Sequence, residues 1–149
     1  RKVAFLVADG VSKASVDALK GALEAEGAEA VLISTRVGPM KYKEGGTETI
    51  AHAYLTERSV CYDAVYTPEG DSVAALSGNA DYIAFVNEAY LHCKAIAFAK
   101  GAAALLDKTL VKEDEGVVMG KEGAWTKDFI AVMKKHRVWS REKARKVPV

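Results

Sequence analysis

Covalent catalysis needs a nucleophile held beside hydrogen-bond donors, and residues 96–106 (IAFAKGAAALL) have a pattern that can provide this. The apolar run predicts a buried strand that turns directly into a helix. Such an elbow holds its apex side chain beside backbone N–H groups of the helix start, which can stabilise an oxyanion. The apex here is Ala99, followed by Lys100 and Gly101. Because a methyl group cannot attack a substrate, we expect an elbow without covalent chemistry.

The two cysteines, Cys61 and Cys93, are the other candidate nucleophiles. Cys93 precedes the predicted strand 95–99, so the length of that strand, about 15 Å, separates its thiol from the elbow. The neighbouring His92 points about 100° away around the helix, and His52 stands nine residues before Cys61. We expect both cysteines to be small buried side chains. A hydrolase that uses one of them is the alternative.

Metal and nucleotide sites find little support in the sequence. The three histidines form no HxxxH or HxH pair, and we expect His136 to pack on the apolar face of the last helix. The turn at residues 8–15 (ADGVSKAS) has one glycine, whereas a dinucleotide site requires GxGxxG. Ser12 and Ser15 are its only hydroxyls for a flavin phosphate, and both can cap the following helix instead. We therefore expect no bound cofactor and no metal.

The charge balance argues against nucleic acid and membrane partners. With 21 basic and 20 acidic side chains the net charge is +1, so no overall field attracts polyanions. From Lys134 onward seven Lys and Arg residues stand against Glu142 alone, but only Trp139 is available there to stack on bases. No apolar run reaches the ~18 residues of a membrane span. Two cysteines without a disulfide framework favour an intracellular setting.

Strands and helices alternate along the chain and must position the elbow. Continuous apolar runs predict buried strands, and apolar spacings of three and four predict helices between them. We expect strands at 3–8, 30–35, 63–67, 95–99 and 116–120, and helices at 12–26, 79–94, 101–106 and 126–137. Residues 36–50 have turn signals that allow a short antiparallel excursion. This order predicts an α/β fold in one domain, residues 1–149: a doubly wound parallel sheet with helices on both faces, flavodoxin-like.

The ends and faces of the helices can also be assigned. Ser12 or Ser15 caps the first helix and Gly27 ends it, while Asn79 caps the helix at 79–94 and Lys94 closes it. Thr126 caps the last helix. The expected buried faces are Ile83, Val86 and Tyr90 in the middle helix, and Phe129, Val132, Met133 and His136 in the last. Ligands of such folds bind at the carboxyl ends of the strands, so the turns at 9–15, 68–72 and 99–101 are where a site is expected.

Three segments carry a family resemblance: residues 1–38, residues 79–106 and the ending HRVWSREKARKVPV at 136–149. Together they resemble the C-terminal domain of large-subunit (clade 2) monofunctional haem catalases, and the likeness covers essentially the whole chain. The HRVWS stretch is its most specific part. That domain is similar in fold to the class I glutamine amidotransferase and ThiJ/PfpI group, whose elbow carries a cysteine supported by a glutamate of the first turn. The matching positions here hold Ala99 and Ser15.

The resemblance implies that the chain is a fragment of a longer protein, which decomposes hydrogen peroxide at a haem as a homotetramer. Haem ligands and the NADP-site region would belong to the preceding catalase core, so none is carried onto this sequence. The implied role is a non-catalytic accessory domain that contacts the core and neighbouring subunits and stabilises the tetramer. Two other hypotheses for the function remain open. One is a holdase for unfolded client proteins, and the other is a ThiJ/PfpI-like hydrolase or deglycase that uses Cys61 or Cys93.

Overall fold

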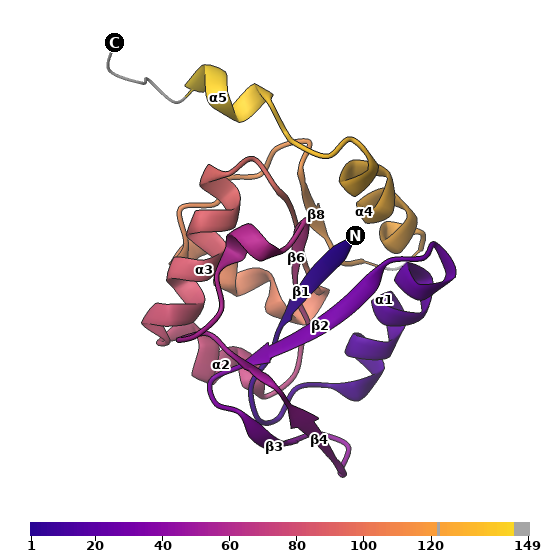
Figure 1. Cartoon of the computed structure of the whole chain (residues 1–149), viewed down its shortest axis with the longest axis vertical. Coiled ribbons are helices and arrows are strands. Elements are labelled where there is room, and N and C mark those ends of the chain that lie inside the picture. Colours follow the sequence, from indigo (N-terminus) through magenta and orange to yellow (C-terminus); the bar gives the residue numbers. More distant parts are fainter. Residues whose placement is uncertain (122, 145–149) are drawn as a thin grey trace.

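A six-stranded parallel sheet forms the centre of the protein in the computed structural model, which describes residues 1–121 and 123–144 (Figure 1). Its strand order is β5-β2-β1-β6-β7-β8. The strands are β1 (Lys2–Leu6), β2 (Glu29–Ser34), β5 (His52–Ala53), β6 (Ala64–Thr67), β7 (Ala95–Phe98) and β8 (Val117–Met119). Every residue of β6 and β7 is buried, as is typical of parallel strands covered on both faces.

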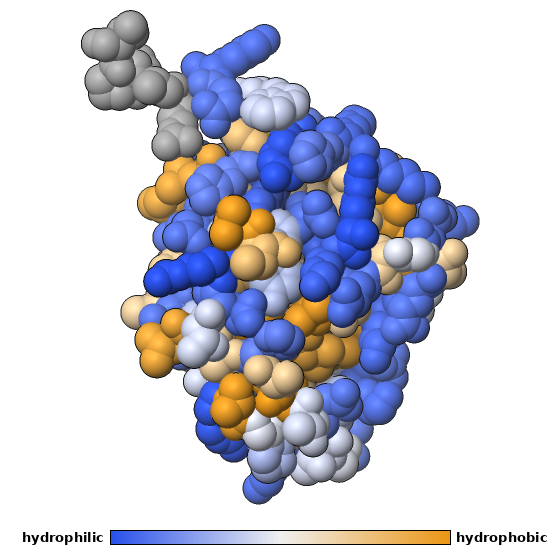
Figure 2. All heavy atoms as spheres, in the orientation of Figure 1, coloured by the Kyte–Doolittle hydropathy of each residue, from blue (hydrophilic) through white to orange (hydrophobic). Residues whose placement is uncertain are grey.

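Helices cover both faces of this sheet, which confirms the predicted doubly wound, flavodoxin-like architecture (Figure 1). One face packs against α1 (Lys13–Ala25) and α4 (Trp125–Lys134), and the other against α2 (Ser72–Ser77), α3 (Ala80–Leu91) and the 3₁₀ segment η2 (Lys100–Lys108). The face of the molecule seen in Figure 2 is covered mostly by hydrophilic side chains.

The shorter elements lie at the ends of the strands. An antiparallel hairpin of β3 (Gly38–Lys41) and β4 (Thr47–Ile50) forms the expected excursion, while η1 (Ser59–Cys61) precedes β6 and α5 (Ser140–Ala144) ends the described chain. The hairpin supports the start of α1, because Glu44 accepts hydrogen bonds from the Lys13 N–H and the Ser12 hydroxyl. The hydrogen bond from the Lys13 N–H is the main cause that lowers the pKa of Glu44 to about 2. No local sequence pattern predicts this second cap.

The capping predictions were confirmed for two helices. The Ser12 hydroxyl accepts a hydrogen bond from the Ser15 N–H, and Asn79 Oδ1 accepts one from the Tyr82 N–H at 2.8 Å. Gly27 has the left-handed φ of +73° that ends α1. The prediction for the last helix was wrong: α4 begins at Trp125, one residue before Thr126, and has no side-chain cap.

The predicted buried faces need three corrections, of which the smallest is Val132: it is only half-buried, whereas Ile130 is buried. In α3 the buried residues are Tyr82, Phe85, Val86 and Ala89, while Ile83 and Tyr90 are only half-buried. The helix is rotated from the expected face because Tyr54 packs edge-on against the rings of Tyr82 and Phe85. His136 is exposed rather than packed, because α4 ends at Lys134 and the chain turns away at His136 with a φ of +71°.

Lys94 does not close α3 at the surface, as predicted, but is buried with 1% of its surface exposed. Its ammonium group donates a hydrogen bond to the Ser59 carbonyl and thereby joins η1 to the start of β7. Burial is the main cause that lowers the pKa of Lys94 to about 8, and the nearby Arg137 adds to the effect. The side chain turns inward because α3 ends before it, at His92, so that Lys94 already leads into the sheet.

Replacing Lys94 by methionine should remove a pH dependence of stability. The folded pKa of about 8 lies below the ordinary value of 10.5, so between these values the unfolded state binds more protons and the wild type gains stability as pH rises. From pH 7 to pH 9.5 the wild type should gain about 2 kcal/mol relative to Lys94→Met in urea unfolding. If the free energies of unfolding of the two proteins change equally with pH, Lys94 has an ordinary pKa.

Candidate functional site

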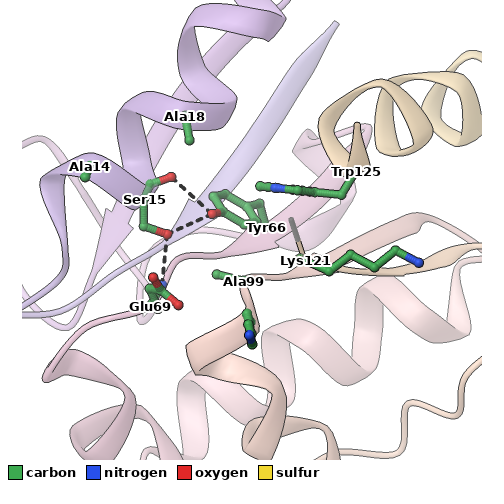
Figure 3. A pocket seen from close by; sticks show the side chains of 10 residues that line it. Ala14, Ser15, Ala18, Tyr66, Glu69, Ala99, Lys121 and Trp125 are labelled. Atoms are coloured by element: carbon green, nitrogen blue, oxygen red, sulfur yellow. Dashed lines mark hydrogen bonds between the residues drawn. The ribbon is translucent and has the colours of Figure 1, made fainter. Parts of the chain in front are cut away.

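Three turns that the sequence placed at the carboxyl ends of the strands meet around one pocket of about 310 Å³ (Figure 3). Ser15 comes from the first turn of α1, Glu69 from the turn after β6, and Ala99 and Lys100 from the elbow after β7. The other lining residues are Ala14, Ala18, Tyr66, Gly120, Lys121 and Trp125. The expected juxtaposition of these turns is therefore present.

The elbow at Ala99 lacks the strain expected of a nucleophile elbow. Ala99 has ordinary extended backbone angles, with φ −60° and ψ 157°, and only 5% of its surface is exposed. Its N–H donates a hydrogen bond to the Thr67 carbonyl on the neighbouring strand β6. Behind it, Gly120 packs so closely that a Cβ there would lie 2.9 Å from the Ala99 Cα. The apex methyl is thus held as part of the core.

A carboxylate occupies the hydrogen-bond donor at the elbow. Glu69 Oε2 accepts a hydrogen bond of 2.6 Å from the Gly101 N–H, one of the free donors at the start of η2 that would otherwise be available to an oxyanion. A Cβ on Gly101 would lie 2.5 Å from the same oxygen, so the contact requires glycine at this position. The sequence interpretation missed Glu69, although it stands in the predicted turn at 68–72. The signal was an acidic residue after the strand that neighbours the elbow strand.

Ser15 bridges the neighbouring elements rather than standing free in the pocket (Figure 3). Its hydroxyl pairs with the Tyr66 hydroxyl at 2.9 Å and accepts the Glu69 N–H at 3.1 Å. The Tyr66 hydroxyl also donates to the Ser15 carbonyl, and burial raises the pKa of Tyr66 to about 12. The ring of Trp125 lies over Tyr66 with 5.5 Å between centroids. Ser15 therefore positions Glu69, and among the described residues neither a histidine nor an aspartate lines the pocket to activate the Ser15 hydroxyl.

The structure does not bring either cysteine to this pocket. Cys61 ends η1, which precedes β6, and Cys93 lies two residues before the start of β7, so both lie at the amino edge of the sheet. The four residues of each strand span about 13 Å between that edge and the elbow. Cys93 is buried, as predicted, but Cys61 is exposed, because the short η1 segment stands outside the sheet. His52 pairs with Glu57 at 2.6 Å instead of approaching a thiol.

The described residues also lack a metal-binding cluster and a membrane-spanning helix. Among residues 1–121 and 123–144 no group of three or more His, Cys, Asp or Glu side chains could hold a metal ion. Within the same ranges no helix has the length and apolar character needed to cross a bilayer. Of the basic residues near the end of the chain, Arg145 and Lys146 lie outside the described part.

Solved structures with the same fold include oxidized DJ-1 of Toxoplasma gondii and DJ-1beta of Drosophila melanogaster. The first superposes with a TM-score of 0.71 at 14% identity over 96% of this chain and 94% of that one. The second superposes with a TM-score of 0.74 at 11% identity over 97% and 94%. At these identities the comparison shows a shared DJ-1/ThiJ/PfpI fold and nothing about activity.

Sequence comparison reaches much closer relatives. The chain is 36% identical to Catalase HPII of Pseudomonas aeruginosa over 98% of its own length and 37% identical to Catalase C of Rhizobium meliloti over 95%. In both cases it spans only 21% of the relative's length. The family model for the C-terminal domain found in long catalases matches residues 1–143. The resemblance noted in the sequence is therefore confirmed, and the chain belongs to the family of C-terminal domains found in long catalases.

Proposed function

We propose that this chain is a non-catalytic accessory domain of a longer haem catalase, in which it contacts the catalase core and neighbouring subunits and stabilises their assembly. The hydrogen bond between Glu69 and the Gly101 N–H, beside the methyl group of Ala99, is the observation that carries the proposal. The relatives that match nearly the whole chain are catalases several times longer than it. Peroxide decomposition then belongs to the remainder of the longer protein.

The electrostatics of the elbow oppose acyl transfer. A second negative charge about 4 Å from the Glu69 carboxylate would be repelled by about 4 kcal/mol at an effective dielectric constant near 20. Lys100 and Lys121 line the pocket but are exposed, so water screens much of their attraction for an anion. An oxyanion developing beside Gly101 would thus have to displace a carboxylate that the fold already provides.

The elbow pocket does not fit a haem. Proteins bind haem iron through histidine, cysteine, methionine or tyrosine. Within the part of the chain that the structure describes, none of the first three lines the pocket. The one tyrosine, Tyr66, has its hydroxyl bonded to both the hydroxyl and the carbonyl of Ser15 and its ring against Trp125. In this proposal the haem chemistry takes place in the part of the longer catalase outside this chain.

A second candidate function is a holdase for unfolded proteins. Six large apolar side chains are exposed among the described residues: Val37, Leu55, Val60, Leu91, Leu110 and Trp139. Exposed apolar surface can bind unfolded clients. Light scattering of a heated client protein separates the two functions, because a holdase lowers the scattering when the domain is added and a purely structural domain leaves it unchanged. The hydrolase alternative would have to use Cys61 or Cys93 at the opposite edge of the sheet from the elbow.

Removing the domain should destabilise the longer catalase without altering its chemistry. We expect the catalase lacking residues 1–149 to lose activity at least about fivefold faster on heating, because a folded partner surface is lost. Turnover per haem at 25 °C should stay within about twofold of the intact enzyme. Unchanged thermal inactivation, or a large loss of turnover per haem, would contradict the accessory role.

The reactivity of a thiol placed at the elbow should depend on the negative charge of Glu69. In a Cys61→Ser background we expect Ala99→Cys to react slowly with iodoacetamide, because the apex is largely buried and the neighbouring carboxylate disfavours the thiolate. Adding Glu69→Gln keeps a hydrogen-bond acceptor of similar shape but removes the charge, and should raise the alkylation rate about tenfold at pH 7. Equal rates with and without Glu69→Gln would mean that the carboxylate does not control this position.

A further inference from the structure

Three exposed apolar side chains surround one hollow of about 300 Å³ at the amino edge of the sheet. Val60 comes from η1, Leu91 from the end of α3 and Trp139 from the residue before α5, with 70%, 42% and 66% of their surfaces exposed. We call these three residues the amino-edge patch. Figure 2 shows hydrophobic side chains at the surface in this region, where α3 ends near α5. Val37, Leu55 and Leu110 are also exposed, but they do not line this hollow.

The backbone beside Trp139 is fixed to the sheet. The Val138 N–H donates a hydrogen bond of 2.6 Å to the Cys93 carbonyl, and the Val138 side chain is 6% exposed. The Val138 side chain also packs over Gly116, where a Cβ would collide with it. The indole of Trp139 is thus exposed next to a residue that belongs to the core.

Arg141 fixes the chain on the other side of Trp139. Its guanidinium forms two hydrogen bonds with the Asp114 carboxylate, at 2.7 and 3.0 Å, and another with the Lys94 carbonyl at 2.6 Å. It also lies 4.4 Å from the ring centre of Tyr90. Because both flanks are anchored, the exposure of Trp139 does not come from a loose segment. A fixed, exposed indole beside two aliphatic side chains is the composition of an interface anchor.

In a long catalase, the part of the chain that precedes this domain would enter it at β1, beside this patch. The amino end of β1 is held next to the start of β6, where Lys2 and Asp63 exchange hydrogen bonds of 2.8 Å. Asp63 stands three residues after Val60 of the patch. The chain spans only about a fifth of its long relatives, so the polypeptide that leads into β1 in such a protein passes close to Val60. A tethered surface has a high effective concentration at this position.

We propose that the amino-edge patch is the surface through which the domain docks on the preceding part of the same catalase chain, with Trp139 as the central anchor. The inference rests on the proposed accessory function and specifies the contact surface. Arg137 and Glu142 also line the hollow, which gives the apolar centre a polar rim, as is typical of protein interfaces. The complementary surface should be an apolar area that receives the indole.

Hydrogen exchange in the intact long catalase tests this proposal. We expect Trp139→Ser to raise amide exchange about tenfold in residues 59–63 and 90–94, because the docked surface opens more often. Leu110→Ser is the matched control, since Leu110 is 58% exposed and does not line the hollow. It should leave exchange in both segments unchanged.

Two results would overturn the proposal. One is exchange in Trp139→Ser that matches the Leu110→Ser control. The other is dissociation of the subunits of Trp139→Ser without increased exchange at the amino edge of each chain, which would assign the patch to a second copy. Either result can occur while deletion of the domain still destabilises the catalase, so this test and that of the accessory function can fail separately.

Discussion

The parallel sheet places the Glu69 carboxylate within hydrogen-bonding distance of the Gly101 N–H. This hydrogen bond decides what the pocket at the elbow can do, because it occupies the donor that an oxyanion would need. Strands β6 and β7 are neighbours in register, so the turns after them end side by side and place an acidic side chain against the start of η2. Ser15 holds the Glu69 backbone from the adjoining helix α1, and Gly101 leaves room for the carboxylate. A helix start attracts anions, and here the protein supplies the anion itself.

The opposite edge of the sheet is built from contacts of another kind. Lys94 is buried with its ammonium on the Ser59 carbonyl, and Arg141 fastens α5 to Asp114 and to the backbone after α3. These contacts keep the segments around Trp139 in place and leave its ring exposed. The two ends of the strands therefore differ: at the carboxyl edge the Glu69 carboxylate occupies the elbow donor, whereas the amino edge exposes apolar side chains.

Much of this fold could be predicted from the sequence, because parallel strands are continuous apolar runs and three of the helix ends have ordinary signals at Ser12, Gly27 and Asn79. Long-range contacts could not be predicted from the sequence. The face of α3 is set by the ring of Tyr54, which lies far earlier in the sequence, and no local pattern shows that Lys94 turns inward to η1. The convergence of three turns followed from topology, but the pairing of Glu69 with Gly101 required knowledge of which strands are neighbours.

The Gly101 amide proton reports most directly on the central claim, because it is the donor that the Glu69 carboxylate occupies. In NMR hydrogen exchange this amide should be protected in the wild type, because a hydrogen-bonded amide proton exchanges slowly. Glu69→Ala removes the acceptor and should raise the exchange rate of the Gly101 amide at least about tenfold, while the rest of the spectrum stays native. A Gly101 amide that exchanges freely in the wild type, or that is equally protected in Glu69→Ala, would contradict an elbow donor occupied by the protein's own carboxylate.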